Sequence, residues 1–267
     1  MLWDTHLHSR FSGDSTADPA QIIKAARKLH LSGICFTDHM DLDYPEGSTL
    51  FHLDTDAYMN TLPALAADCK DLSVCVGIEL GLQPQLADVH RQLLSAYPFD
   101  FVIGSSHTVH GRDPYFSAFY EGHPEEESYR EYFSSILENL AVYDDFDVYG
   151  HIDYVVRYGP NRNRFYTYEK YADLLEEILR TLIDMGKGIE LNTGGFRYGL
   201  GHPNPTEEIL KRYRQLGGEI ITIGSDAHAP DQMAYDFAKV PGLLRDAGFR
   251  YFTVFQNRTP RFLPLSE

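Results

Sequence analysis

The sequence has few cysteines and no long apolar run. Its three cysteines, Cys35, Cys69 and Cys75, are odd in number and form no Cys-x-x-Cys pair, which favours free thiols in a reducing compartment. No apolar stretch approaches the length of a membrane span, and the N-terminus lacks the basic-then-apolar pattern of a signal peptide. We therefore expect a cytoplasmic protein with no membrane partner.

Positive charge is also scarce. Lysine and arginine total 23 against 39 aspartates and glutamates, which gives a formal net charge of −16. Such a surface repels nucleic acid and anionic membranes, so we expect neither as a partner. A small anionic substrate is not excluded, because bound divalent cations reverse the local charge. The composition does not indicate an oligomeric state.

Short apolar runs alternate along the chain with longer amphipathic segments. Hydrophobic residues make up 43% of the sequence, enough for a large core. The runs predict strands over residues 2–5, 33–37, 73–78, 100–104, 146–149, 188–191 and 219–223, with a possible eighth strand over 251–255. The segments between them predict helices over residues 19–30, 55–70, 84–97, 125–143, 168–186, 206–216 and 231–247. This repeat predicts a parallel α/β barrel, and no linker divides residues 1–267 into more than one domain.

Polar, chemistry-capable side chains follow seven of the predicted strands. They are Asp4, His6 and His8 after the first; Asp38 and His39 after the second; then Glu79, His107, His151 and Asn192; and finally Asp226 and His228. Each alone is weak evidence for a metal site, because single histidines and acids near strand ends usually have structural roles. Together they predict a site, because the carboxyl ends of barrel strands converge on one face. The remaining histidines lack this placement, and we expect His30 and His90 to lie on the surface.

The predicted ligands outnumber the needs of one metal ion. Residues two apart in a strand point the same way, so His6 with His8, and Asp226 with His228, can each chelate. The full set is six imidazoles and three carboxylates: His6, His8, Asp14, His39, Glu79, His107, His151, Asp226 and His228. A mononuclear site takes three or four protein ligands, so this set fits two or three ions. Its histidine content suits Zn, Fe or Mn, and Glu79 is the candidate bridging ligand.

These motifs resemble those of the polymerase-and-histidinol-phosphatase (PHP) superfamily over essentially the whole chain. The matching segments are Asp4-Thr5-His6-Leu7-His8, Thr37-Asp38-His39, Gly77-Ile78-Glu79, Ser105-Ser106-His107, Gly150-His151 and Ser225-Asp226-Ala227-His228. The resemblance implies a distorted (β/α)7 barrel and a trinuclear metal centre. It implies one ion held by His6, His8, Glu79 and Asp226, a second by Glu79, His107 and His151, and a third by Asp14, His39 and His228. Asp38 would orient His39 or a neighbour.

Within the superfamily the chain is most similar to stand-alone histidinol-phosphate phosphatases. Asn192-Thr193-Gly194-Gly195, the arginine-containing loop after it and residues 251–258 carry this weaker likeness. It implies hydrolysis of L-histidinol phosphate in histidine biosynthesis. We predict catalytic roles for Glu79, Asp226, His228 and Asp14. The acidic loop residues Asp113, Glu121 and Glu46 are open alternatives for binding the substrate amine.

Arginines in two loops are candidates for the phosphate, because a guanidinium donates two parallel hydrogen bonds. Arg162 and Arg164 follow His151, and Arg197 follows Asn192. We predict substrate binding by Arg162, Arg197 and His202, while a purely solvated role is open for each. The rival functions are a PHP-type tyrosine phosphatase, another phosphoesterase or nuclease, and a non-catalytic scaffold with a decayed site. The scaffold is disfavoured because all nine ligand positions hold metal-capable side chains.

Overall fold

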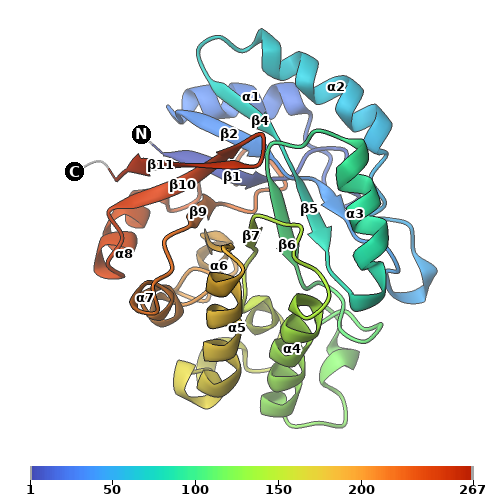
Figure 1. Ribbon diagram of the computed structural model, residues 1–267, viewed down its shortest axis with the longest axis vertical. Helices are drawn as coiled ribbons and strands as arrows, with labels where there is room; N and C mark the ends of the chain where they lie inside the picture. Colours follow the sequence, from blue (N-terminus) through green and yellow to red (C-terminus); the bar gives the residue numbers. More distant parts are fainter. Residues whose placement is uncertain (1, 266–267) are drawn as a thin grey trace.

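A ring of parallel strands surrounded by helices dominates the computed structural model, which describes residues 2–265 (Figure 1). Two parallel sheets form the ring, with strand orders β1-β2-β4 and β3-β5-β6-β7-β8-β9. The bounds of these strands are β1 Trp3–Leu7, β2 Gly33–Phe36, β3 His39–Met40, β4 Ser73–Val76, β5 Ile78–Gly81, β6 Val102–Ser105, β7 Val148–Tyr149, β8 Gly188–Asn192 and β9 Ile221–Gly224.

The strands predicted over residues 33–37 and 73–78 correspond to β2 and β4, and each is followed closely by a second strand that the sequence pattern did not separate. β2 and β3 are separated by two residues, and β4 and β5 by Gly77 alone. A side chain at position 77 has no room, because a Cβ there would lie 2.5 Å from the carbonyl oxygen of Phe101. The interruptions place β2 and β4 in the sheet that contains β1, while β3 and β5 belong to the sheet that continues to β6. The barrel is therefore distorted rather than regular.

The ring closes between its first and last parallel strands. Leu7 and Ala227 form a parallel bridge, the amide of His8 donates to the carbonyl oxygen of Ala227 at 2.9 Å, and the amide of Asp226 donates to that of His6 at 2.9 Å. Thr5 adds a bond from its hydroxyl to the carbonyl oxygen of Ile223 at 3.0 Å. The predicted distorted (β/α)7 barrel is confirmed.

Helices cover the outside of the ring in Figure 1. The helix bounds are α1 Pro19–Lys28, α2 Thr55–Asp68, α3 Ala87–Ala96, α4 Glu125–Leu140, α5 Ala172–Asp184, α6 Gly194–Arg197, α7 Glu207–Gln215 and α8 Val240–Asp246. Short 3-10 turns span Pro45–Gly47, Pro84–Leu86, Ser117–Tyr120, Tyr154–Arg157, Arg162–Phe165, Tyr168–Tyr171 and Phe237–Lys239. Helix caps match the sequence: Asp18 accepts from the amide of Ala20, and Pro19 opens α1. None of the helices in residues 2–265 is long and apolar enough to cross a bilayer.

The predicted eighth strand exists but does not join the parallel ring. It is β10 (Tyr251–Gln256), which pairs antiparallel with β11 (Thr259–Pro264), a strand that the sequence pattern did not predict. The turn of this hairpin packs where β6 and β7 begin: the amide of Arg258 donates to Asp100, and its Nε donates to Asp147 at 2.7 Å. The hairpin therefore covers the amino-terminal end of the barrel and leaves the carboxyl end free.

One predicted surface residue is buried. His90 lies on α3 with 1% of its surface exposed, and its ring packs edge-on against Tyr143 with centroids 5.6 Å apart. The surface prediction for His90 is therefore wrong, while His30 is exposed as expected. Because α3 is amphipathic, its inward face needs a residue of about this size, and a neutral imidazole fills the position. The one-domain prediction for residues 1–267 stays a prediction.

Candidate metal centre

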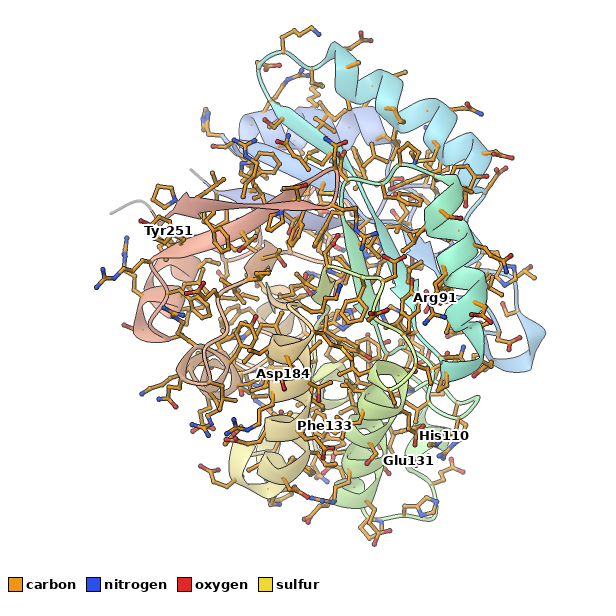
Figure 2. All side chains as sticks on the ribbon, in the orientation of Figure 1. Arg91, His110, Glu131, Phe133, Asp184 and Tyr251 are labelled. Atoms are coloured by element: carbon orange, nitrogen blue, oxygen red, sulfur yellow. The ribbon has the colours of Figure 1, made fainter. Side chains whose placement is uncertain are left out.

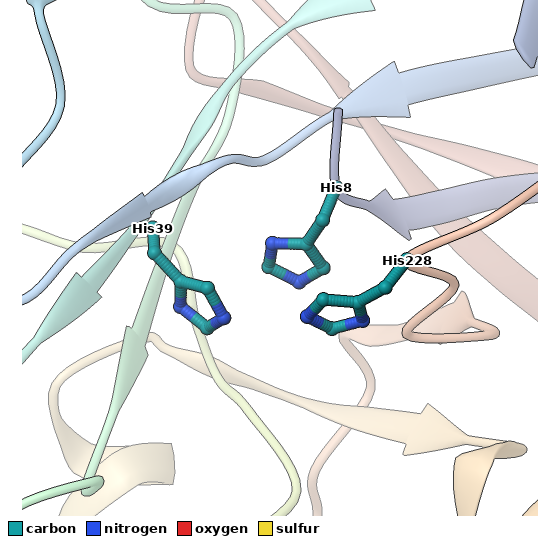
Figure 3. A group of neighbouring side chains, drawn as sticks. All are labelled: His8, His39 and His228. Atoms are coloured by element: carbon teal, nitrogen blue, oxygen red, sulfur yellow. The ribbon is translucent and has the colours of Figure 1, made fainter. Parts of the chain in front are cut away.

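The metal-capable residues predicted from the sequence lie together at the carboxyl end of the barrel. Most are fully or nearly fully buried, including Glu79 and His6, each with no exposed surface. Figure 3 shows the imidazoles of His8, His39 and His228, which come from three different strand ends and converge on one space. The ring of His8 stacks on that of His228 at 4.0 Å and on that of His39 at 4.2 Å.

The first group of ligand atoms comes from His6, His8, Glu79 and Asp226. His6 Nε2 lies 3.1 Å from His8 Nε2, 3.2 Å from Glu79 Oε2 and 3.7 Å from Asp226 Oδ1. His8 Nε2 lies 3.5 Å from Glu79 Oε2 and 3.4 Å from Asp226 Oδ1. Ligands bonded to one Zn²⁺ at about 2.1 Å stand roughly 3 to 3.5 Å apart. The four atoms thus have the spacing that one ion imposes.

The second group shares Glu79 with the first. Its other carboxylate oxygen, Oε1, lies 3.1 Å from His151 Nε2 and 3.3 Å from His107 Nε2, and these two nitrogens are 3.5 Å apart. The two oxygens of Glu79 therefore face different sets of imidazoles. This is the arrangement of a carboxylate that bridges two ions, as the sequence predicts for Glu79. Ser105 donates to Oε1 at 2.7 Å and fixes the carboxylate orientation.

The third group is more open to solvent. Asp14 Oδ2 lies 3.1 Å from His228 Nε2 and 3.7 Å from His39 Nε2. The side chains of Asp14 and His228 are 38% and 20% exposed, so this edge of the cluster faces the cavity. His8, His39 and His228 also have ring nitrogens close enough to hold one ion between them.

Glu79 Oε2 is a buried acceptor with no hydrogen-bond donor among the residues of the structure. It lies 3.1 Å from His39 Nδ1, in addition to its contacts with His6 and His8. An unsatisfied buried carboxylate oxygen is costly, since it loses its hydration without replacement. A divalent ion satisfies this oxygen and the surrounding imidazole nitrogens together. The chemistry of the donor set therefore fits metal ions.

The electrostatics of the cluster point the same way. Burial alone would raise the pKa of Glu79, but the surrounding imidazoles, led by His6, hold it well below its ordinary value. Burial likewise lowers the pKa of His107, yet the nearby carboxylates, led by Asp41, raise it to about 10. The arrangement thus stabilises positive charge at its centre. Metal binding supplies that charge while leaving the histidines deprotonated.

Several histidines are oriented by partners that the sequence did not indicate. Glu190 accepts from His6 Nδ1 at 2.7 Å, and Asp41 accepts from His107 Nδ1 at 2.7 Å. In each case a proton on Nδ1 leaves Nε2 free as a ligand. Both acids could have been recognised: Glu190 interrupts the apolar strand β8, and Asp41 lies two residues after His39.

Asp38 acts through Ser12 rather than on a metal-facing atom. The Ser12 hydroxyl donates to Asp38 Oδ1 at 2.7 Å and lies 3.1 Å from His8 Nδ1. Because the Ser12 hydroxyl donates its hydrogen bond to Asp38, its oxygen accepts one from His8 Nδ1. This contact leaves His8 Nε2 facing the cluster. The amide of His39 also donates to the Ser12 hydroxyl at 3.0 Å. The prediction that Asp38 orients His39 or a neighbour agrees with these contacts.

An arginine that the sequence reasoning missed lies beside the cluster. Arg157 is 3% exposed and donates from Nη1 to Asp226 Oδ2 at 2.6 Å, from Nε to Asn204 at 2.8 Å and from Nη2 to Asn192 at 3.1 Å. Burial opposes ionisation of Asp226, but Arg157 is the strongest of the charges that hold its pKa well below the ordinary value. The sequence signal for Arg157 is its position in the loop that follows His151.

The three predicted substrate-binding residues lie farther out. Arg162 is exposed and donates to the carbonyl oxygen of Tyr198 at 3.1 Å, Arg197 donates to that of Asp226 at 2.7 Å, and His202 contacts that of Pro203. None of the three lines the main cavity formed by residues 2–265, whereas Arg157 does. Their roles in substrate binding stay predictions.

The cluster forms part of the wall of a cavity of about 860 Å³, large enough for a small metabolite. Asp14, His39, His107, His151, Asp226 and His228 line its inner part. Aromatic residues line much of the remainder, including Tyr44, Phe51, Tyr115, Phe116, Tyr154 and Tyr158.

Comparison with known proteins gives the family. The model of the PHP domain matches residues 4–194, most of the chain, including the first seven of the nine predicted ligands. The chain belongs to the PHP domain family. It is 34% identical to a probable histidinol-phosphatase of Clostridium acetobutylicum, over 89% of this chain and 90% of the relative. It is 32% identical to the histidinol-phosphatase of Lactococcus lactis, over 95% and 94%.

Solved structures of the PHP family agree with the observed barrel. The histidinol phosphate phosphatase of Lactococcus lactis, solved in complex with zinc, L-histidinol and phosphate, superposes with a TM-score of 0.91. It is 30% identical in the aligned region, which covers 97% of this chain and 98% of that one. A putative histidinol phosphatase of Listeria monocytogenes, 18% identical, has the same fold, with a TM-score of 0.76 over 89% of this chain and 99% of that one.

Proposed function

We propose that this PHP-family protein is a metal-dependent phosphomonoesterase that hydrolyses L-histidinol phosphate to L-histidinol and phosphate. The observation that carries the proposal is the bridging position of Glu79 within the nine-residue cluster, at a cavity sized for a small metabolite. The similarity to histidinol-phosphatases along almost the whole chain supports the choice of substrate. The reaction belongs to histidine biosynthesis.

The cluster is proposed to hold two or three divalent ions, with Zn, Fe or Mn suited to its many imidazoles. His6, His8, Glu79 and Asp226 would hold one ion, and Glu79, His107 and His151 a second. Asp14, His39 and His228 would hold a third. Ions bound in this way supply an activated water near neutral pH and neutralise charge on the phosphoryl oxygens.

The chain's own side chains divide the remaining work. Glu79 fixes the spacing between two groups of ligands through its separate oxygens. Asp226 is kept ionised and in place by Arg157, whose guanidinium also borders the cavity and offers positive charge to a phosphoryl group. Asp14 and His228 lie at the exposed edge of the cluster and line the cavity, so they are open to a phosphate ester that enters from solvent.

We further propose a cytoplasmic location and a small phosphorylated substrate as the only partner needed for activity. The location is supported by the odd number of cysteines and the lack of a Cys-x-x-Cys pair, which favour a reducing compartment.

The test is phosphate release from L-histidinol phosphate by purified protein, before and after chelation and after re-addition of Zn²⁺ or Mn²⁺. We expect activity to disappear with the metal and to return with it. Phosphotyrosine and a dinucleotide are measured in parallel, because they represent the tyrosine-phosphatase and nuclease alternatives. A higher kcat/KM for either alternative would contradict the proposed substrate, and purified protein without metal or activity would indicate a scaffold.

A further inference from the structure

The cavity has two aromatic walls that both begin at the histidine cluster. On one side the ring of Tyr154 lies 5.1 Å from that of His151, and Tyr158 follows at 5.1 Å from Tyr154. Tyr115 continues this wall, with its ring 5.2 Å from that of Tyr158. These faces are suited to a planar, partly apolar group such as an imidazole.

The other wall runs from His39 through Phe51 to Tyr44. The ring centroids are 5.4 Å apart for the first pair and 4.9 Å for the second. Both walls end on the same side chain, Asp113. The Tyr44 hydroxyl donates to Asp113 Oδ2, and the amide of Tyr115 donates to Oδ1 at 2.7 Å.

Asp113 differs from the other carboxylates that line the cavity. Asp41 contacts His107 at 2.7 Å, Asp14 contacts His228 at 3.1 Å, and Asp226 contacts His8 at 3.4 Å, so all three belong to the histidine cluster. Among the cavity-lining residues of the structure, Asp113 is the acid that contacts no imidazole. A carboxylate accepts about four hydrogen bonds, so it retains capacity after its two bonds to Tyr44 and Tyr115.

The loop that carries Asp113 is held against α4 by two residues that precede Asp113. His110 contacts two glutamates of α4, Glu131 at 2.9 Å and Glu138 at 2.8 Å, and Arg112 donates to Glu131. Figure 2 shows His110 and Glu131 side by side at the lower right of the molecule. These contacts hold the position of Asp113 before any ligand binds, which reduces the entropy lost on binding.

Asp113 lines the same cavity as the histidine cluster. Burial raises its pKa above the ordinary value, while the hydrogen bonds from Tyr44 and from the amide of Tyr115 oppose that rise. With 6% of its surface exposed, the side chain is almost fully shielded from bulk water. An arriving cation therefore interacts with it more strongly than with a surface carboxylate.

We propose that Asp113 is a specificity-determining residue that binds the protonated amine of the substrate while the aromatic walls enclose its imidazole. This inference rests on the proposed function and deepens it, since L-histidinol phosphate carries a primary amine beside its phosphate-bearing carbon. Such an amine is protonated at neutral pH and donates charge-assisted hydrogen bonds. Selection for a cationic amine separates this ester from alkyl and aryl phosphates that lack an amine.

The test uses two substrates that differ only in the amine: L-histidinol phosphate and its deamino analogue, in which hydrogen replaces the amino group. The readout is the ratio of their kcat/KM values with the metal-loaded protein. We expect the wild type to prefer the amine-bearing ester by roughly 10- to 100-fold, the range for a hydrogen bond to a charged group. Asp113→Asn is expected to reduce this preference to within about threefold.

Two further variants complete the design. Asp113→Glu keeps the negative charge, so we expect it to retain most of the preference for the amine-bearing ester. A purely structural role of Asp113 does not predict this result. Glu127→Gln removes an exposed carboxylate at the start of α4 that does not line the cavity, and the ratio should stay at the wild-type value. Circular dichroism and metal content establish that each variant is folded and loaded.

The outcomes separate the two proposals. An Asp113→Asn protein that keeps the wild-type ratio overturns the role of Asp113 while leaving histidinol-phosphate hydrolysis intact. Equal loss of activity on both esters also overturns it, because the residue would then matter for the structure of the site and not for the amine. A wild type that hydrolyses neither ester rejects the proposed function, and this inference with it.

Discussion

Arg157 donates from Nη1 to Oδ2 of Asp226 at 2.6 Å, and both side chains are almost fully buried. The other oxygen of Asp226 faces His6 and His8. The same carboxylate thus links a fixed guanidinium to the predicted metal ligands. Burying either charge without its partner is costly, so the two residues depend on each other.

Replacing Arg157 by Gln removes the guanidinium from this pair. In chelator-treated protein we expect the free energy of unfolding to fall by about 3–5 kcal/mol, because Asp226 is left buried without a counter-charge. In metal-loaded protein we expect kcat/KM for the phosphate ester to fall roughly 100-fold, as with the loss of a single preorganised donor. Urea titration and steady-state kinetics measure the two effects.

Arg180→Gln, on the exposed face of α5, is the matched control for Arg157→Gln. Arg197→Ala provides a direct comparison, since Arg197 was predicted from the sequence to bind phosphate, yet its guanidinium donates to the backbone carbonyl oxygen of Asp226 and does not line the cavity. A larger loss of kcat/KM in Arg197→Ala than in Arg157→Gln would contradict the assignment of Arg157.

Replacing Glu79 by Gln converts the proposed bridging carboxylate to an amide. We expect metal content to fall by at least one ion per chain and turnover to fall roughly 1,000-fold, which corresponds to about 4 kcal/mol of lost transition-state stabilisation. Metal analysis after gel filtration and phosphate-release kinetics are the measurements. Glu177→Gln, an exposed change on α5, should alter neither. Full metal occupancy together with normal turnover in Glu79→Gln would remove Glu79 from the bridging position.

Replacing Glu190 by Gln tests the orientation of His6. Glu190 accepts from His6 Nδ1 at 2.7 Å without contacting the cavity, so its loss acts on a ligand and not on the substrate. We expect metal affinity to fall 10- to 100-fold, the usual range for such supporting residues, while excess metal restores most of the turnover. Competition with a chromophoric chelator measures the affinity. An unchanged affinity would show that His6 is held in place by packing alone.

The buried His90 predicts a pH-dependent stability. Burial lowers its pKa from 6.5 to about 4, so the folded protein keeps the ring neutral where the unfolded chain protonates it. The contribution of the neutral His90 ring to the free energy of unfolding is complete above pH 6.5 and is lost as the pH falls toward 4. At pH 5 this amounts to about 2 kcal/mol less stability than at pH 7.5. Other groups titrate in the same interval, so the wild type must be compared with a variant.

His90→Leu is expected to remove that part of the pH dependence, whatever its absolute stability. Urea titrations at pH 7.5 and 5 give the difference for each protein. His123→Leu, at an exposed position, should keep the wild-type difference. If His90→Leu loses as much stability as the wild type between the two pH values, the ring is not the source.

The barrel and most of the cluster could be predicted because their signals are local in the sequence. Asp-x-His-x-His and Ser-Asp-x-His place side chains two apart at strand ends, and the βα repeat shows that these ends converge. What the sequence did not indicate depends on distant contacts. Glu190 and Arg157 each carry a weak sequence signal, but the role of each is defined only by the position of β8 and of the loop after His151 beside the cluster.

Two other differences have a similar origin. The apolar pattern of β10 predicts a strand but does not show whether that strand joins the parallel ring. Its antiparallel partner β11 contains two prolines and is largely exposed, so it lacks the apolar pattern by which a strand is predicted. Arg162 and Arg157 occupy the same loop, and only the three-dimensional course of that loop turns one toward Tyr198 and the other toward Asp226.

The closure of the ring between β1 and β9 determines when the site can form during synthesis. Asp4, next to the first predicted ligands, receives bonds from the amide and hydroxyl of Ser225 at 2.9 and 2.6 Å. The ligands His6 and His8 are thus translated long before Asp226 and His228, and they remain without these partners until the segment that contains β9 has been made. Metal binding by the complete set of ligands therefore follows assembly of the barrel instead of guiding it.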